Sequence, residues 1–227
     1  MFFTVYSVAQ DFDKLTLLFF LFPTSTKNHN FCYNRRMKFA ALFVIVFFYS
    51  VYLGKMLAQR KKGIRTDQIA VGKKGALFWT ELLMKIATYS AVVAEVASVF
   101  FVYPVLPPPV QIAGILIGLF GDAVFLCAVL TMKDSWHAGI SESDRTKIVT
   151  GGIYSASRNP AFLAFDLVYL GVLLVFFNIP LLVISVFAAV MLHLQILQEE
   201  KFLPTVFGDE YRNYKKHVRR YLGRRKV

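Results

Sequence analysis

The sequence predicts an all-α integral membrane bundle of about five transmembrane helices, followed by a C-terminal amphipathic helix on the cytoplasmic side. Of its 227 residues, 56% are hydrophobic and only 18% are charged, with 26 Lys and Arg against 14 Asp and Glu. Soluble domains carry about 25% charged residues. This composition excludes a disordered chain and an ordinary water-soluble enzyme. Little sequence remains for a basic soluble domain, so no nucleic-acid partner is expected.

The predicted spans are apolar stretches of about 17 to 25 residues, the length that crosses a hydrocarbon core. Five stretches qualify: residues 39–57, 86–105, 110–131, 161–177 and 180–197. The apolar stretch 15–22 is too short to span.

The basic residues alternate between the connections. Seven Lys and Arg lie between the first and second spans, four follow the third and nine lie in the tail, whereas the connections after the second and fourth spans carry none. Cytoplasmic loops are enriched in Lys and Arg. The pattern therefore predicts an outside N-terminus and a cytoplasmic C-terminus.

Residues 1–36 do not fit this topology, because they would place four basic residues outside. They also lack the order of basic, apolar and cleavage regions that a signal peptide has. We hypothesise that this N-terminal extension is dispensable, that Met37 is the functional start and that residues 37–227 form a single membrane domain. A terminal extension that the working protein retains explains the same residues equally well.

Three acids lie within predicted spans: Glu95, Asp122 and Asp166. A charge at membrane depth costs several kcal/mol unless it faces protein or water, so an ion or proton pathway is one interpretation. The other is that these carboxyl groups are protonated or hydrogen-bonded between helices. The chain lacks the repeat symmetry typical of secondary transporters, which makes transport the weaker hypothesis.

No metal site is expected. The two cysteines, Cys32 and Cys127, have no CxxC spacing, and the four histidines are scattered along the chain.

Two polar segments follow the third and fifth spans. The first, residues 148–162, reads IVTGGIYSASRNPAF. Its glycines permit close backbone approach, and Pro160 suits the first turn of a helix, whose free N–H groups can hold an anion. By itself this is a generic junction between a loop and a helix.

The second segment, residues 199–220, reads EEKFLPTVFGDEYRNYKKHVRR. Pro204 and Gly208 predict breaks, with a helix from Asp209. Its apolar stripe predicts a helix that lies on the membrane surface or caps the bundle. That stripe consists of Tyr211, Tyr214, Val218 and Tyr221. Just before it, Gln195 and Glu199 share one helical face at the end of the fifth span, which suggests a ligand site.

Together these segments resemble the isoprenylcysteine carboxyl methyltransferase family and its relatives, which include phospholipid N-methyltransferases. The family pattern pairs LVTxGxYxxxR(H/N)PxY with EExxLxxxFGxEYxxYxxxVxR. Both halves match here at the right separation, over roughly the last 90 residues.

The resemblance implies a membrane methyltransferase that uses S-adenosyl-L-methionine and moves a methyl group to a lipophilic or lipidated acceptor. The cofactor region is then about residues 133–227. Arg158 would orient the acceptor, and Gln195 is the second candidate catalytic residue. The implied cofactor-binding residues are Lys147, Ile148, Val149, Tyr154, Asn159, Pro160, Phe162 and Glu199.

Two positions depart from the family pattern. Thr146 replaces a histidine, and Gln195 replaces the arginine that contacts the substrate carboxyl group in carboxyl methyltransferases. The acceptor, and whether it is methylated on oxygen, nitrogen or sulfur, therefore stays open. Two alternatives also stay open: a sterol-reductase-like membrane enzyme that uses NADPH, and a non-enzymatic membrane scaffold.

Overall fold

The computed structural model describes residues 26–64, 69–70, 72–135 and 148–225. Its contacts divide the chain into two compact units, Met1–Arg36 and Met37–Val227. The candidate site described below lies in the second unit.

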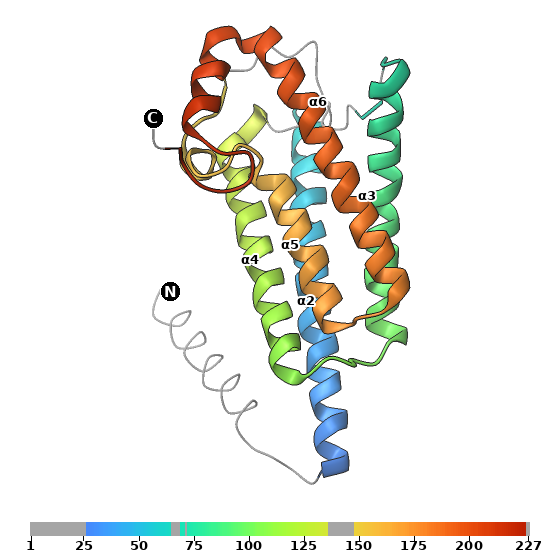
Figure 1. Ribbon diagram of the computed structural model, residues 1–227. Coiled ribbons are helices and arrows are strands. Elements are labelled where there is room, and N and C mark those ends of the chain that lie inside the picture. Colours follow the sequence, from blue (N-terminus) through green and yellow to red (C-terminus); the bar gives the residue numbers. More distant parts are fainter. Residues whose placement is uncertain (1–25, 65–68, 71, 136–147, 226–227) are drawn as a thin grey trace. The chain divides into compact units, whose positions relative to one another are not determined.

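The described part of the chain is an all-helical bundle (Figure 1). Its long helices are α2 (Thr26–Lys61), α3 (Gly75–Phe101), α4 (Pro108–Met132), α5 (Pro160–Val175) and α6 (Ile179–His217). Among the described residues, α2, α3, α4 and α6 are long and apolar enough to cross a membrane, and α5 is a shorter apolar helix. These helices confirm the predicted all-α membrane bundle.

The helix starts follow their local sequence. Proline occupies the first turns of α4, α5 and α6, where a missing N–H costs nothing. Asn178 caps α6 by accepting a hydrogen bond from the Leu181 N–H at 2.9 Å. The Asn178 side chain also donates to Ser98 Oγ at 2.9 Å, which links the start of α6 to the end of α3.

Helices α4 and α5 pack at backbone distance. A Cβ atom on Gly171 would lie 2.7 Å from the Gly114 carbonyl oxygen and 2.8 Å from the Gly118 nitrogen, so no larger residue fits without a shift. Small residues allow membrane helices this approach. This contact joins the last turns of α5 to the first half of α4, and a Cβ atom on Gly121 would lie 3.1 Å from the Ala164 carbonyl oxygen nearer the start of α5.

Two apolar clusters fill the bundle. Phe48, Phe125 and Phe165 meet between α2, α4 and α5, with the ring centroids of Phe48 lying 4.4 and 4.7 Å from those of the other two. The second cluster joins α3 and α6 and includes Met84 and Leu192. Phe165 also packs against this second cluster, and it lines the cavity described below together with Met84 and Leu192.

Helix α6 bends at Gly208, whose φ of 55° and ψ of −130° break the helix into two segments. Glycine adopts this positive φ without strain. The second segment turns over the end of the bundle (Figure 1), as a capping helix would. It ends at His217, so Val218 and Tyr221, predicted to belong to its apolar stripe, lie beyond the helix.

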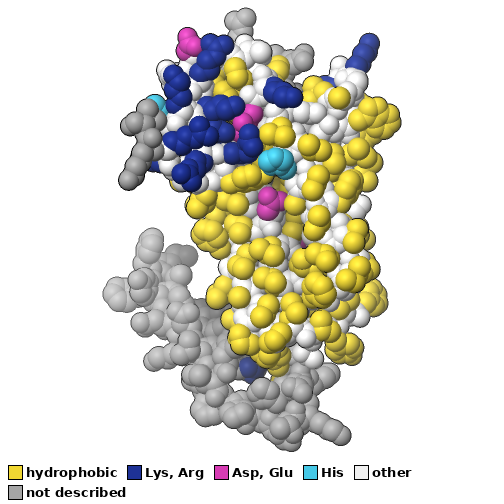
Figure 2. All heavy atoms as spheres, viewed as in Figure 1, with side chains coloured by type: hydrophobic (Ala, Val, Ile, Leu, Met, Phe, Trp, Pro, Cys, Tyr) yellow, Lys and Arg dark blue, Asp and Glu magenta, His cyan; other side chains and the backbone are white. Residues whose placement is uncertain are grey.

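The surface divides into an apolar body and a basic end. In the view of Figure 2, hydrophobic side chains cover the body and Lys and Arg side chains gather around the C-terminal tail. The tail's basic residues include Arg212, Lys215, Lys216, Arg219, Arg220 and Arg224.

Candidate functional site

The loop before α5 lies along the C-terminal tail. The Arg158 N–H donates to the Arg219 carbonyl at 3.1 Å, and the Gly223 N–H donates to the Ala156 carbonyl at 2.7 Å. The Asn159 side chain donates to the Arg220 carbonyl at 3.0 Å. The structure thus brings together two segments that are about 60 residues apart in sequence.

The loop also turns tightly around the end of α4. It contains a short 3-10 helix, η2 (Gly152–Ser155). Gly152 has a φ of 58°, and a Cβ there would lie 2.9 Å from a side-chain carbon of Thr131. This glycine is therefore required by contact with α4.

Arg158 fixes the tail to the bundle. Its Nη1 atom donates to the carbonyls of Lys215 and Val218, both at 3.1 Å, and its Nη2 atom pairs with Glu200 at 2.5 Å. The residue is buried, and its Nε atom has no hydrogen-bond partner. It also lines the cavity, so its predicted role toward the acceptor stays a prediction beside this structural one.

Glu200 is the centre of this cluster. Besides Arg158, it pairs with Arg220 at 2.9 Å and Lys215 at 3.2 Å. Its hydrogen bond raises the pKa of Arg220 above the ordinary value for arginine. The Glu200 side chain is only 5% exposed, so the surrounding cations balance a buried charge.

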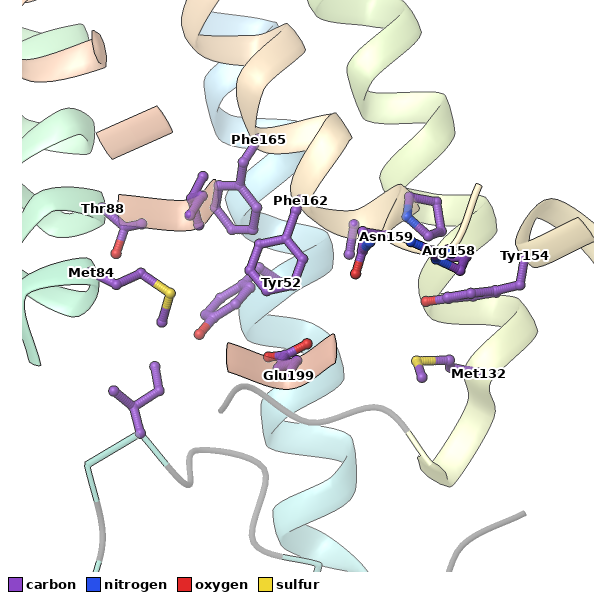
Figure 3. A pocket seen from close by; sticks show the side chains of 14 residues that line it. Tyr52, Met84, Thr88, Met132, Tyr154, Arg158, Asn159, Phe162, Phe165 and Glu199 are labelled. Atoms are coloured by element: carbon purple, nitrogen blue, oxygen red, sulfur yellow. The ribbon is translucent and has the colours of Figure 1, made fainter. Parts of the chain in front are cut away.

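A cavity of about 140 Å³ opens beside this cluster. Figure 3 shows Tyr154 and Asn159 on one side, Glu199 below them, and Tyr52, Met84, Thr88 and Phe165 on the other. Five of the predicted cofactor-binding residues line it: Tyr154, Asn159, Pro160, Phe162 and Glu199.

The remaining predicted residues lie elsewhere. Ile148 and Val149 are described by the structure but do not line this cavity, and Lys147 lies outside the described residues. Gln195 is fully buried and is not a lining residue. Its side chain lies between two carboxylates, donating to Glu199 at 3.1 Å and to Glu81 at 3.3 Å.

Tyr154 is a neutral, buried phenol. Burial raises its pKa above the usual value for tyrosine, followed by smaller contributions from Tyr214 and Glu199. Its main-chain carbonyl accepts a hydrogen bond from the Tyr214 hydroxyl at 2.6 Å. The tail thus holds the backbone of a ring that extends toward the cavity (Figure 3).

Glu199 presents its carboxyl group to the cavity and has no ion-pair partner among the described residues. Its hydrogen bond comes from the Gln195 amide. A carboxylate placed in this way favours a cationic group in the cavity.

Sequence reasoning missed Glu81. This residue lies in the second turn of α3 and is fully buried. It precedes the predicted span 86–105 and belongs to no recognised motif. The signal that could have revealed it is an acid inside the apolar run LFWTELLM.

Comparisons with known proteins point to one family. Residues 114–205 match the model of the isoprenylcysteine carboxyl methyltransferase family. A protein-S-isoprenylcysteine O-methyltransferase from Xenopus laevis is 30% identical over 111 residues, which cover 48% of this chain and 38% of that protein.

A short uncharacterised protein from Haemophilus influenzae is 49% identical over 39 residues, which cover 17% of this chain and 62% of that protein. The matches therefore span less than two thirds of the length of each relative. Residues 114–205 are thus similar to the isoprenylcysteine carboxyl methyltransferase family, which confirms the resemblance predicted from the loop and tail motifs.

Proposed function

We propose that this chain is an integral membrane methyltransferase that uses S-adenosyl-L-methionine to methylate a lipophilic acceptor. One observation carries the proposal: the Glu199 carboxylate faces a cavity that residues of both family motifs line, and it has no ion-pair partner among the described residues. The family match favours this function over the NADPH-dependent and scaffold alternatives.

The cavity residues fit the cofactor's chemistry. Glu199 would accept hydrogen bonds from its ammonium group. The rings of Tyr154 and Phe162 would pack against its adenine. The first N–H groups of α5, after Asn159 and Pro160, would hold its carboxylate. When bound, S-adenosyl-L-methionine supplies a methyl group on a sulfonium centre.

The acceptor would enter from the apolar side of the same cavity. Met84, Phe165 and Leu192 line that side and belong to the bundle's apolar clusters, which suits a lipid or a lipidated group. The protein would hold the acceptor at near-attack distance and exclude water. A carboxylate acceptor would need no general base, whereas an amine would need one.

We further propose that the basic end of the bundle faces the cytoplasm and that the N-terminus lies outside. The Lys and Arg counts of the connections support this orientation. The tail's exposed basic side chains would then contact anionic lipid headgroups. Residues 1–36 would be dispensable, which a deletion starting at Met37 would test through membrane insertion.

The experiment that tests the function is calorimetric titration of the purified protein with S-adenosylhomocysteine. Binding is expected for the wild type and for the control Glu210→Gln, which changes an exposed tail carboxylate. Glu199→Gln should abolish measurable binding. Wild-type protein that binds NADPH and not S-adenosylhomocysteine would overturn the proposal.

The acceptor can be sought in the same material. Membranes incubated with methyl-labelled cofactor should transfer label, and separate extraction of lipid and protein would show which class receives it. Glu199→Gln membranes provide the blank.

A further inference from the structure

A buried network connects the cavity to the start of α3. Glu81 is 0% exposed, and both of its carboxylate oxygens accept hydrogen bonds from Lys73 Nζ at 2.6 Å. Glu81 Oε1 also accepts from the Gln195 amide, whose same nitrogen donates to Glu199. Glu81 is therefore two hydrogen bonds from the carboxylate that faces the cavity.

The same carboxylate holds a second part of the cavity wall. Glu81 Oε2 accepts a hydrogen bond from the Ala70 N–H at 2.6 Å. The neighbouring residue, Ile69, lines the cavity. Glu81 thus acts on the cavity both through α6 and through the connection that precedes α3.

The carboxyl groups in this network differ in whether they have an ion-pair partner. Lys73 and Glu81 form an ion pair whose side chains are 5% and 0% exposed, so each neutralises the other. Both also interact electrostatically with Glu199. While Lys73 is paired with Glu81, it does not pair with Glu199, and the negative charge of Glu199 can interact with a ligand.

We propose that Glu81 is a positioning residue of the cofactor site. It orients Glu199 through Gln195, fixes Ile69 on the cavity wall, and keeps Lys73 from competing with the cofactor's cationic group. The inference rests on the proposed function, since it treats Glu199 as the cofactor's carboxylate partner.

The test compares two variants that break the same ion pair. Glu81→Gln keeps the shape of the side chain but removes the charge that holds Lys73 away from Glu199, so S-adenosylhomocysteine should bind about tenfold more weakly, as expected for a lost charge-assisted contact. Lys73→Met leaves the negative charge beside Glu199, so binding should stay equal or tighten. A merely structural ion pair predicts equal losses in the two variants.

A matched control lies one residue away. Thr80 accepts a hydrogen bond from Gln198 at 2.8 Å, which joins α3 to α6 at the same level but outside the network. Thr80→Val should bind like the wild type, even where its melting temperature falls. The double variant Lys73→Met, Glu81→Gln should recover most of the affinity lost by Glu81→Gln.

The outcomes separate the two proposals. Absence of binding by the wild type would overturn the proposed function and this inference with it. Wild-type binding with equal affinities in Glu81→Gln and Lys73→Met would overturn the inference alone. If Glu81→Gln does not fold, Lys73→Met still decides: unchanged or tighter binding supports the positioning role, and about tenfold weaker binding refutes it.

Discussion

Two adjacent glutamates on α6 have opposite surroundings. Glu200 pairs with Arg158, Lys215 and Arg220, whereas Glu199 accepts a hydrogen bond from a neutral amide and faces the cavity. Successive helical residues differ in direction by about 100°, so neighbouring side chains can reach different parts of the fold. The same type of side chain thus forms an ion-pair cluster at one position and faces the cavity at the next.

The two residues of this dipeptide therefore contribute to the site in different ways. Glu200 draws the loop and the tail together, and that contact builds the wall on which Tyr154 and Asn159 lie. Under the proposed function, Glu199 is then available to the cofactor. Substitutions of the two residues should therefore separate stability from binding.

The largest stability effect is expected at Glu200. Glu200→Ala leaves the buried Arg158 guanidinium without its ion-pair partner, and breaking a buried pair costs about 3–5 kcal/mol in unfolding free energy. Thermal unfolding in detergent and trypsin release of the tail would measure it. Asp209→Ala is the control, because its pair with Arg212 is exposed. Equal melting temperatures of the two variants would show that Glu200 does not hold the tail to the bundle.

Glu199→Gln should weaken binding and leave stability unchanged or raised. Loss of a hydrogen bond to a charged group weakens cofactor-product binding by about 1.5–3 kcal/mol, which lies at or beyond the detection limit of a weak titration. Stability should stay level or rise, because a charge without an ion pair is removed from the cavity wall. A melting temperature as low as that of Glu200→Ala would show that the two glutamates share one role.

Much of the fold could be predicted because hydrocarbon imposes simple length and polarity limits on a helix. The prediction was inaccurate at the start of α3, which begins at Gly75 instead of near residue 86. Glu81 and Lys85 made that stretch read as polar. In the fold Glu81 is neutralised by Lys73, a compensation that hydropathy along the chain does not register.

The candidate site was predictable in outline from the loop and tail motifs, which the structure places side by side. The different surroundings of Glu199 and Glu200 could not be predicted, because they depend on which Lys and Arg side chains of the tail reach each carboxyl group. The link from Gln195 to Glu81 spans 114 residues, and such pairing becomes visible only when the helices are packed.

Tyr214 tests whether the tail, which Glu200 holds to the bundle, keeps the cavity wall in place. Tyr214→Phe removes the hydroxyl that donates to the Tyr154 carbonyl at 2.6 Å, and a hydrogen bond of this kind contributes about 0.5–1.5 kcal/mol. S-adenosylhomocysteine affinity should fall a few-fold because the Tyr154 ring loses its fixed backbone. Unchanged affinity with lowered stability would mean that the loop keeps its place without the tail.

Lys215→Met should have the smallest effect on stability. It therefore tests how much the burial of an ion pair matters for holding the tail to the bundle. Its side chain is 43% exposed and lies 3.2 Å from Glu200, which is already paired with two arginines. Exposed ion pairs contribute less than about 1 kcal/mol and weaken with salt. Lys215→Met should therefore lower the melting temperature slightly in dilute buffer and not at high salt. A loss as large as that of Glu200→Ala would mean that total charge, and not the contacts of Glu200 with Arg158 and Arg220, holds the tail to the bundle.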